Sequence, residues 1–346
     1  WHDRIYMLAE PDGAWQLLDT TLPHPVAYSV SLTWNDTVIA LGGADAEKHY
    51  ADVISLRWTE DGLVCDPLPS MPAPVAFFCG ALLGDHVYIA GGLSKPGVKA
   101  PLRTFWRLDL NNLEAGWEEL APWPGRPRYL AVAGAQDGAF FLFGGCDLVP
   151  DGNGGVQREF LTDAYRYTPG SGWDRIADIP GSVFAAPTPA PALGGAHLLV
   201  FGGHDGEPPP SELENLKDNW PPFTDQILAY HTITDTWTEM GHLPLDLGPD
   251  PAGEPNKGTW PAITTVTTWW RGHIVVPNGE IRPGVRTPRV AWAEPQSVKS
   301  GFRLADAIVI LIYLAALVGM GVYFSRREKT TDDFFLGGRR VPWWAA

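Results

Sequence analysis

Four apolar runs along the chain each end at a pair of glycines. They are "VIALGG" ending at Gly43, "VYIAGG" ending at Gly92, "FLFGG" ending at Gly145 and "LLVFGG" ending at Gly203. A short apolar run closed by glycines is typical of a buried strand, because glycine tolerates the tight turn that follows. The pairs recur at intervals of 49, 53 and 58 residues. This spacing predicts a structural repeat of about fifty residues.

A second pattern follows these runs, in which an aromatic residue, a turn, a tryptophan and a proline succeed one another. The clearest copies are "AYRYTPGSGWDRIADIP" from residue 164 and "AYHTITDTWTEMGHLP" from residue 229, and looser copies begin at residues 4 and 104. Repeats of this length with four short strands each are typical of propeller blades. We therefore expect an all-β propeller over residues 1–296.

The blade count follows from the glycine pairs. Four pairs indicate four blades, and a fifth copy has its pair reduced to Asn278-Gly279. Residues 1–23 supply only the outer two strands of a further blade, and missing inner strands would leave unpaired edges. We expect six blades with one incomplete, in a chain that begins inside a longer gene product.

A long apolar segment follows a short linker at residues 297–303. Residues 304–324 contain one charged side chain, Asp306. As a helix the segment would span roughly 30 Å, the thickness of a bilayer core. A signal peptide would lie at the N-terminus, and a buried soluble helix is rarely apolar on every face. We predict a transmembrane helix, a basic cytoplasmic loop at residues 325–341, and a propeller on the periplasmic or extracytoplasmic side.

Composition narrows the function classes. The chain contains 38 Gly and 33 Pro, which suits many short strands and turns. Its net charge of −15 argues against a nucleic-acid partner, because phosphate binding needs a basic surface. Cys65, Cys79 and Cys146 are odd in number and show no C-x-x-C spacing, so we expect small buried side chains and no metal site.

The candidate chemistry lies in "VVPNGEIRPGVRTPRV", residues 275–290. An apolar strand is followed by Glu280, a Pro283-Gly284 turn and Arg286. We expect Glu280 to be the first residue of a loop, with the turn folding Arg286 back toward it. Loops on a rigid scaffold commonly hold functional residues. On spacing alone, an exposed salt bridge with no catalytic role is the simpler interpretation.

A family resemblance favours catalysis. "NGEIRPGVRTPRV" resembles the signature of the kelch-type sialic acid mutarotases, the N-acetylneuraminate epimerases, and the matching positions are Gly279, Glu280, Pro283, Gly284, Arg286 and Thr287. "AYSVSLTWNDTVIALGG" is similar to the family's last blade but comes first here, as in cyclically permuted members. The resemblance implies a six-bladed kelch propeller in which Glu280 and Arg286 are catalytic. It also implies that Arg286 and Arg128, in "GRPRYLAV", bind substrate. Val26 stands where the family has an arginine.

The implied reaction equilibrates the anomers of N-acetylneuraminate or a related acidic sugar. A carboxylate can serve in turn as base and acid, and a guanidinium binds the sugar carboxylate. No cofactor is implied for the propeller. Two alternatives remain: a non-catalytic module that binds glycan or regulates an attached transporter, and a mutarotase of neutral sugars.

The C-terminal stretch has a resemblance of its own. "DAIVILIYLAALVGMGVYFSRREKTTDDFFLGGRRVPWWAA" is similar to the start of a sodium:solute symporter, with residues 342–346 opening a second helix. This implies a membrane protein that imports the sugar, with a sodium ion bound by transporter helices beyond this chain.

Overall fold

The computed structural model describes residues 1–10, 13–209, 212–216, 219–246, 258–296 and 304–327. Trp1–Pro295 form one compact unit, an all-β propeller, and the C-terminal helix is separate from it. The predicted linker at 297–303, most of the predicted cytoplasmic loop and the start of a second helix at 342–346 lie outside the described residues.

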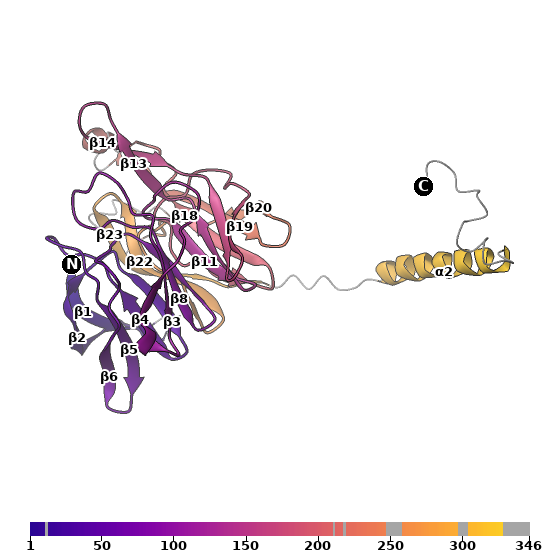
Figure 1. The fold of residues 1–346 in the computed structure, drawn as a ribbon, viewed down its shortest axis with the longest axis horizontal. Coiled ribbons are helices and arrows are strands. Elements are labelled where there is room, and N and C mark those ends of the chain that lie inside the picture. The colour runs from indigo at the N-terminus through magenta and orange to yellow at the C-terminus, as the bar shows by residue number, and fades with distance from the viewer. Residues whose placement is uncertain (11–12, 210–211, 217–218, 247–257, 297–303, 328–346) are drawn as a thin grey trace. The chain divides into compact units, whose positions relative to one another are not determined.

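Five antiparallel sheets form the blades of the propeller (Figure 1). Blade 1 contains β3 (Val30–Trp34), β4 (Thr37–Leu41), β5 (Val53–Thr59) and β6 (Gly62–Leu68). Blade 2 contains β7 (Cys79–Leu83), β8 (His86–Ala90), β9 (Phe105–Asp109) and β10 (Trp117–Glu119), with a 3-10 turn at Leu113–Ala115. Blade 3 contains β11 (Val132–Gln136), β12 (Ala139–Phe143), β15 (Ala164–Thr168) and β16 (Gly172–Ile176).

Blade 4 contains β17 (Ala192–Leu193), β18 (His197–Gly203), β19 (Thr224–His231) and β20 (Thr236–His242), with the short helix α1 (Leu213–Leu216). Blade 5 has three strands, β21 (Thr268–Trp270), β22 (His273–Arg282) and β23 (Val285–Ala293). The hairpin β13 (Cys146–Pro150) and β14 (Val156–Phe160) is inserted in blade 3 and projects from the upper edge of the propeller in Figure 1.

The remaining strands, β1 (His2–Met7) and β2 (Gln16–Val26), form a two-stranded sheet. Among the described residues, the structure therefore shows five blades and the β1–β2 hairpin. The sequence predicted six blades, one of them incomplete with only two outer strands from residues 1–23, and the structure does not confirm the sixth. This hairpin touches blade 1, because Thr20 Oγ1 donates to the Leu63 carbonyl at 3.2 Å. It also touches blade 5, where Arg271 Nη2 donates to Glu10 Oε1 at 3.0 Å.

The hydrophobic core lies between neighbouring blades, and tryptophans on the outer strands of three blades cover it. Trp117, Trp173 and Trp237 each donate from Nε1 to a carbonyl at the end of the preceding blade, those of Pro69, Ala121 and Ala177, at 2.8 to 2.9 Å. The repeated tryptophan of the sequence pattern thus links each of these blades to the one before it. A half-buried indole keeps its N–H paired in this way while its rings cover apolar strands.

In blades 1 to 4 the glycine pair lies at the end of the second strand, in agreement with the buried strands predicted before each pair. Gly91 and Gly92 both have positive φ, and a Cβ at Gly91 would lie 2.3 Å from the carbonyl oxygen of Arg128 in the next blade. Only glycine permits both the conformation and the close approach. In blade 5 the degenerate pair keeps this geometry, because Asn278 has φ 51° and Gly279 has φ 132°.

A chain of backbone hydrogen bonds joins the blades at one end of the central channel. At this end, one non-glycine residue just before the first strand of each blade has φ between 49° and 59°: Tyr28, Phe77, Leu130, Ala185 and Thr264. The N–H of each later residue donates to the carbonyl of the residue before it, at 2.7 to 3.1 Å. We call these five residues the backbone belt. Left-handed residues of this kind are costly and persist only where surrounding structure holds them.

The C-terminal helix α2 (Leu304–Arg327) is long and apolar enough to cross a membrane over Leu304–Tyr323, with a mean hydropathy of 2.3. The predicted helix ended at residue 324, whereas α2 continues through Ser325 and Arg326 to Arg327. These three residues therefore belong to the helix and not to a loop.

Candidate active site

Glu280 and Arg286 face each other within one hairpin. β22 continues through Glu280 to Arg282, β23 begins at Val285, and Glu280 and Arg286 are directly paired across the two strands. Glu280 is therefore a strand residue, and the expectation that it opens a loop was wrong. The Pro283-Gly284 turn does bring the two residues together. Direct partners in an antiparallel pair project to the same face, so the two side chains meet.

Both oxygens of the Glu280 carboxylate are engaged. Oε1 accepts a hydrogen bond from the Gly284 N–H at 2.9 Å. Oε2 accepts from Thr264 Oγ1 at 3.2 Å and lies 3.4 Å from Arg286 Nη2. The Glu280 side chain is 19% exposed and that of Arg286 is 48% exposed. The carboxylate is thus fixed by three groups and is still open to solvent on one side.

The position of Glu280 is unusual when the blades are compared. The equivalent residue follows the glycine pair in each blade: Ala44, Leu93, Cys146 and His204 in blades 1 to 4. Each forms a backbone bridge with the residue immediately before a belt residue. Glu280 does the same with Ile263, which precedes Thr264. Three of these four residues are buried and all four are uncharged or weakly basic. A carboxylate at this place is therefore not required by the propeller fold.

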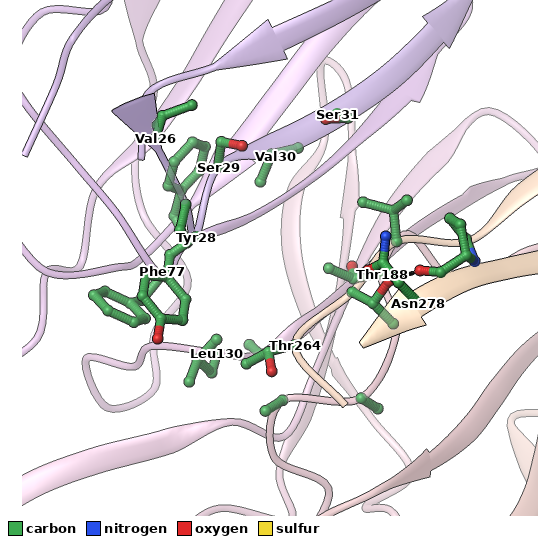
Figure 2. Close-up of a pocket in the computed structure, with 18 of the residues that line it drawn as sticks. Val26, Tyr28, Ser29, Val30, Ser31, Phe77, Leu130, Thr188, Thr264 and Asn278 are labelled. Atoms are coloured by element: carbon green, nitrogen blue, oxygen red, sulfur yellow. Dashed lines mark hydrogen bonds between the residues drawn. The ribbon is translucent and has the colours of Figure 1, made fainter. Parts of the chain in front are cut away.

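Next to this pair lies a cavity of about 370 Å³ at the belt end of the channel. All five belt residues line it, together with Arg286, Asn278 and Val26. Figure 2 shows Tyr28, Phe77, Leu130 and Thr264 along the cavity. Glu280 is not itself a lining residue, but two lining residues, Thr264 and Arg286, contact its carboxylate. The carboxylate therefore lies at the rim of the cavity.

A second cavity of about 470 Å³ lies farther along the channel. Inner-strand residues of all five blades line it, and it is mainly apolar. Ser31 and Val266 line both cavities, so the two are parts of one channel. The polar groups that suit a sugar, including Ser29, Thr188 and Asn278, gather in the first cavity.

Arg128, which the resemblance placed at the substrate, is not among the residues that line either channel cavity. Its side chain is 0% exposed, Nη2 donates to Asp163 Oδ2 at 2.8 Å, and Nη1 donates to the Gly144 carbonyl at 2.8 Å. The guanidinium also lies 5.4 Å from the ring centres of Trp123 and Tyr165. Burial alone would raise the pKa of Asp163, but the hydrogen bond and charge of Arg128 outweigh it and hold that pKa below its usual value. Arg128 therefore joins blades 2 and 3.

Sequence reasoning missed Tyr28 and Thr264. Tyr28 OH accepts a hydrogen bond from Arg286 Nη2 at 3.3 Å, and Thr264 holds Glu280. Tyr28 lies two residues before β3 and Thr264 four residues before β21, where "AYSV" and "ITTV" occupy the same place in the repeat. Aligning the repeats at that point, and not only at the glycine pairs, would have placed both residues around the channel.

Within the described residues, no group of three or more His, Cys, Asp or Glu side chains is placed to hold a metal ion. All three cysteines are free. Cys79 and Cys146 are buried, and burial raises their thiol pKa values to about 12 and about 11. These two are small core side chains, as the sequence indicated.

Comparison with known proteins points to one family. A family model described as N-acetylneuraminate epimerase matches residues 68–205. A Haemophilus influenzae protein named N-acetylneuraminate epimerase is 31% identical over 238 residues, covering 63% of this chain and 57% of that protein. Proteins of the same name from Yersinia enterocolitica and Brucella melitensis are 28% and 25% identical, with 69% and 63% of their lengths covered. The chain thus spans less than two thirds of the Haemophilus relative, and it is similar over most of its propeller to proteins named N-acetylneuraminate epimerase.

Proposed function

We propose that the propeller is a mutarotase that equilibrates the anomers of N-acetylneuraminate or a related acidic sugar. The observation that carries the proposal is the Glu280–Arg286 pair, held at the rim of a cavity that belt residues line. The name shared by the similar proteins supports the same substrate class. A salt bridge alone would not need the further bonds from Thr264 and the Gly284 N–H.

The proposed chemistry uses Glu280 as base and then as acid. The Glu280 carboxylate takes the proton of the anomeric hydroxyl, the bond between the anomeric carbon and the ring oxygen breaks, and the protonated Glu280 then gives that proton to the ring oxygen. The anomeric carbon becomes a ketone, the open chain rotates, and the reverse steps close the ring on the other face. One carboxylate within reach of both oxygens suffices, since each step is a single proton transfer.

Arg286 supplies the complementary charge. N-acetylneuraminate carries a carboxylate on its anomeric carbon, and a guanidinium can bind such a group with two parallel hydrogen bonds. The contact of Arg286 with Glu280, at 3.4 Å, is long. A substrate carboxylate would compete with Glu280 for Nη2, which would leave Oε2 able to accept a proton. The cationic group also offsets the repulsion of an anionic sugar by a chain of net charge −15.

The proposal includes a six-bladed, kelch-type ring in which the β1–β2 hairpin belongs to the sixth blade. Its contacts reach blade 1 through Thr20 and blade 5 through Arg271. Among the described residues, no backbone hydrogen bond joins Thr264 to Tyr28, although the other neighbouring belt residues are joined. An additional belt residue from a sixth blade would fit between these two.

We further propose that the propeller is extracytoplasmic and tethered to a sodium:solute symporter. The apolar segment Leu304–Tyr323 supports a membrane anchor. The run "FFLGGRRVPWW", which resembles the symporter start, and the basic residues after the helix support the direction of crossing. Anomer exchange outside the membrane would then supply whichever anomer the transporter accepts.

The test is NMR exchange spectroscopy on the chain in detergent, with N-acetylneuraminate and a panel of neutral sugars. We expect faster exchange between the anomer signals of N-acetylneuraminate than in protein-free buffer. Binding without faster exchange would favour the non-catalytic glycan-binding module. Faster exchange of neutral sugars alone would leave Arg286 without its proposed partner and would replace the substrate class.

A further inference from the structure

Arg286 has a second partner on a blade far away in the sequence. Its Nη2 donates to Tyr28 OH at 3.3 Å, across 258 positions of the chain. Its guanidinium carbon lies 5.6 Å from the centre of the Tyr28 ring. Arginine combines hydrogen bonding with stacking on aromatic faces, so one tyrosine can hold the fork through its ring and its hydroxyl together.

Tyr28 is itself fixed in place. It is the first residue of the backbone belt, with φ 58°, and its carbonyl accepts from the Phe77 N–H at 3.1 Å. Its ring stacks on that of Phe77, with centroids 4.1 Å apart and planes 27° from parallel. Figure 2 shows these two rings beside each other on the cavity. The surface under Arg286 is therefore a rigid two-ring stack.

This support matters because Arg286 is half exposed and its contact with Glu280 is long. A long side chain at a half-exposed site samples many rotamers unless a neighbour restricts it. Glu280 and Tyr28 contact the same nitrogen, Nη2. When a ligand carboxylate takes Arg286 from Glu280, the Tyr28 ring remains as the group that orients the guanidinium.

We propose that Tyr28 is a positioning residue that holds the Arg286 fork toward the cavity and thereby sets the preference of the site for acidic sugars. The inference rests on the proposed function, since it assigns Arg286 to a sugar carboxylate. Both residues line the cavity, in agreement with this role. Tyr28 contributes no proton and touches the substrate carboxylate only through Arg286.

The experiment compares two ligands of the same shape, N-acetylneuraminate and its C1 amide, on the full chain in detergent. Equilibrium binding gives the ratio of their dissociation constants, and exchange NMR gives kcat and KM for the acid. Tyr28→Phe keeps the ring and removes the hydroxyl, so we expect KM for the acid to rise roughly threefold to tenfold, the usual worth of one hydrogen bond. Tyr28→Leu also removes the ring, so the preference for acid over amide should fall by a further factor of about five. We expect kcat to change less than twofold in Tyr28→Phe.

A double-mutant comparison separates positioning from general structure. In an Arg286→Ala background, Tyr28→Leu should change the acid-to-amide ratio no further, because the two residues act through one contact. A purely structural role would weaken both ligands equally and leave the ratio unchanged, and that result would overturn the proposal. So would a wild-type protein that binds acid and amide equally well.

Failure of the proposed function gives a different pattern. If wild-type protein shows no anomer exchange but its preference for the acid falls in Tyr28→Phe, the mutarotase assignment fails and the role of Tyr28 stands. If exchange is fast and KM for the acid is unchanged in Tyr28→Phe, the mutarotase stands and the role of Tyr28 fails. Tyr28→Phe removes only the hydroxyl of a half-buried side chain, so the measurement does not depend on whether Tyr28→Leu folds.

Discussion

The N–H of Gly284 donates to Glu280 Oε1 at 2.9 Å. The turn of the β22–β23 hairpin therefore holds a carboxylate that Arg286, on the second strand of the same hairpin, also contacts. Gly284, in a two-residue turn, thus fixes a functional group four positions before it in the chain. The orientation of this carboxylate depends on local backbone geometry as well as on Arg286.

Changing Glu280 to Gln should abolish most of the catalysis and leave the fold intact. The amide keeps an acceptor for Gly284 but cannot take a proton, so anomer exchange should slow by about 10² or more, the typical worth of general acid–base catalysis. NMR exchange rates on matched amounts of protein measure this. Exchange at the wild-type rate would remove Glu280 from the mechanism, and unchanged circular dichroism would show that folding is not the cause.

Changing Arg286 to Lys should weaken binding of acidic sugars more than that of neutral ones. Lysine keeps the positive charge but loses the planar fork and its stacking on Tyr28, so we expect KM for N-acetylneuraminate to rise about tenfold, a loss typical of one charge-assisted bond. The matched control is Arg289→Lys, on the same strand and also next to a cavity. Equal effects in the two variants would contradict a specific role for Arg286.

Changing Arg128 to Met should destabilise the propeller without a specific effect on substrate. Removing one partner of a buried ion pair leaves Asp163 uncompensated, which costs about 3 kcal/mol of unfolding free energy. The control is Arg175→Gln, whose exposed pair with Asp178 is worth less than about 1 kcal/mol. Urea unfolding of both variants gives the comparison. A selective rise in KM in a fully stable Arg128→Met protein would restore the substrate-binding role.

Stability should fall as the pH is lowered from 7.5 to 5.5. Burial lowers the pKa values of His204 and His49 in the folded protein, so the unfolded chain binds protons more readily once the pH drops below about 6.5. His204→Gln should reduce this loss of unfolding free energy, measured with urea at both pH values. His242 acts in the opposite sense, because Asp225 raises its pKa, but it is present in both proteins and cancels in the comparison. An equal pH dependence in both proteins would contradict the assignment.

The direction of the membrane crossing can be tested with reporter fusions. A reporter joined after residue 329 should be cytoplasmic, because basic residues follow the apolar segment, and one joined before residue 302 should be external. Activity of paired cytoplasmic and periplasmic reporters in cells measures this. The reverse pattern would place the propeller in the cytoplasm and remove the proposed supply of substrate to an importer.

The repeats in the sequence were enough to predict the blades, but the side-chain contacts between blades could not be predicted from them. Gly43, Gly92, Gly145 and Gly203 each marked the end of a second strand, because their conformation is local to the sequence. Arg128 was assigned to the site from the family resemblance, and no local pattern indicated its pairing with Asp163, which lies 35 positions away, just before β15. Tyr28 was not predicted as a site residue for the same reason. Its contact with Arg286 joins two blades that are 258 positions apart in the sequence. The Glu280 side chain was placed correctly beside Arg286, but the continuation of β22 past a degenerate glycine pair was not predicted.

The backbone belt affects how the substrate preference of such a site can evolve. The bonds that join Tyr28, Phe77, Leu130, Ala185 and Thr264 use only main-chain atoms, and these five side chains already range from a phenol to a methyl group. Substitution at these positions can therefore alter the chemistry of the opening while the spacing of the blades stays constant. The main-chain bonds keep the belt in place while its side chains vary, so a new sugar preference can arise by single substitutions at these five positions.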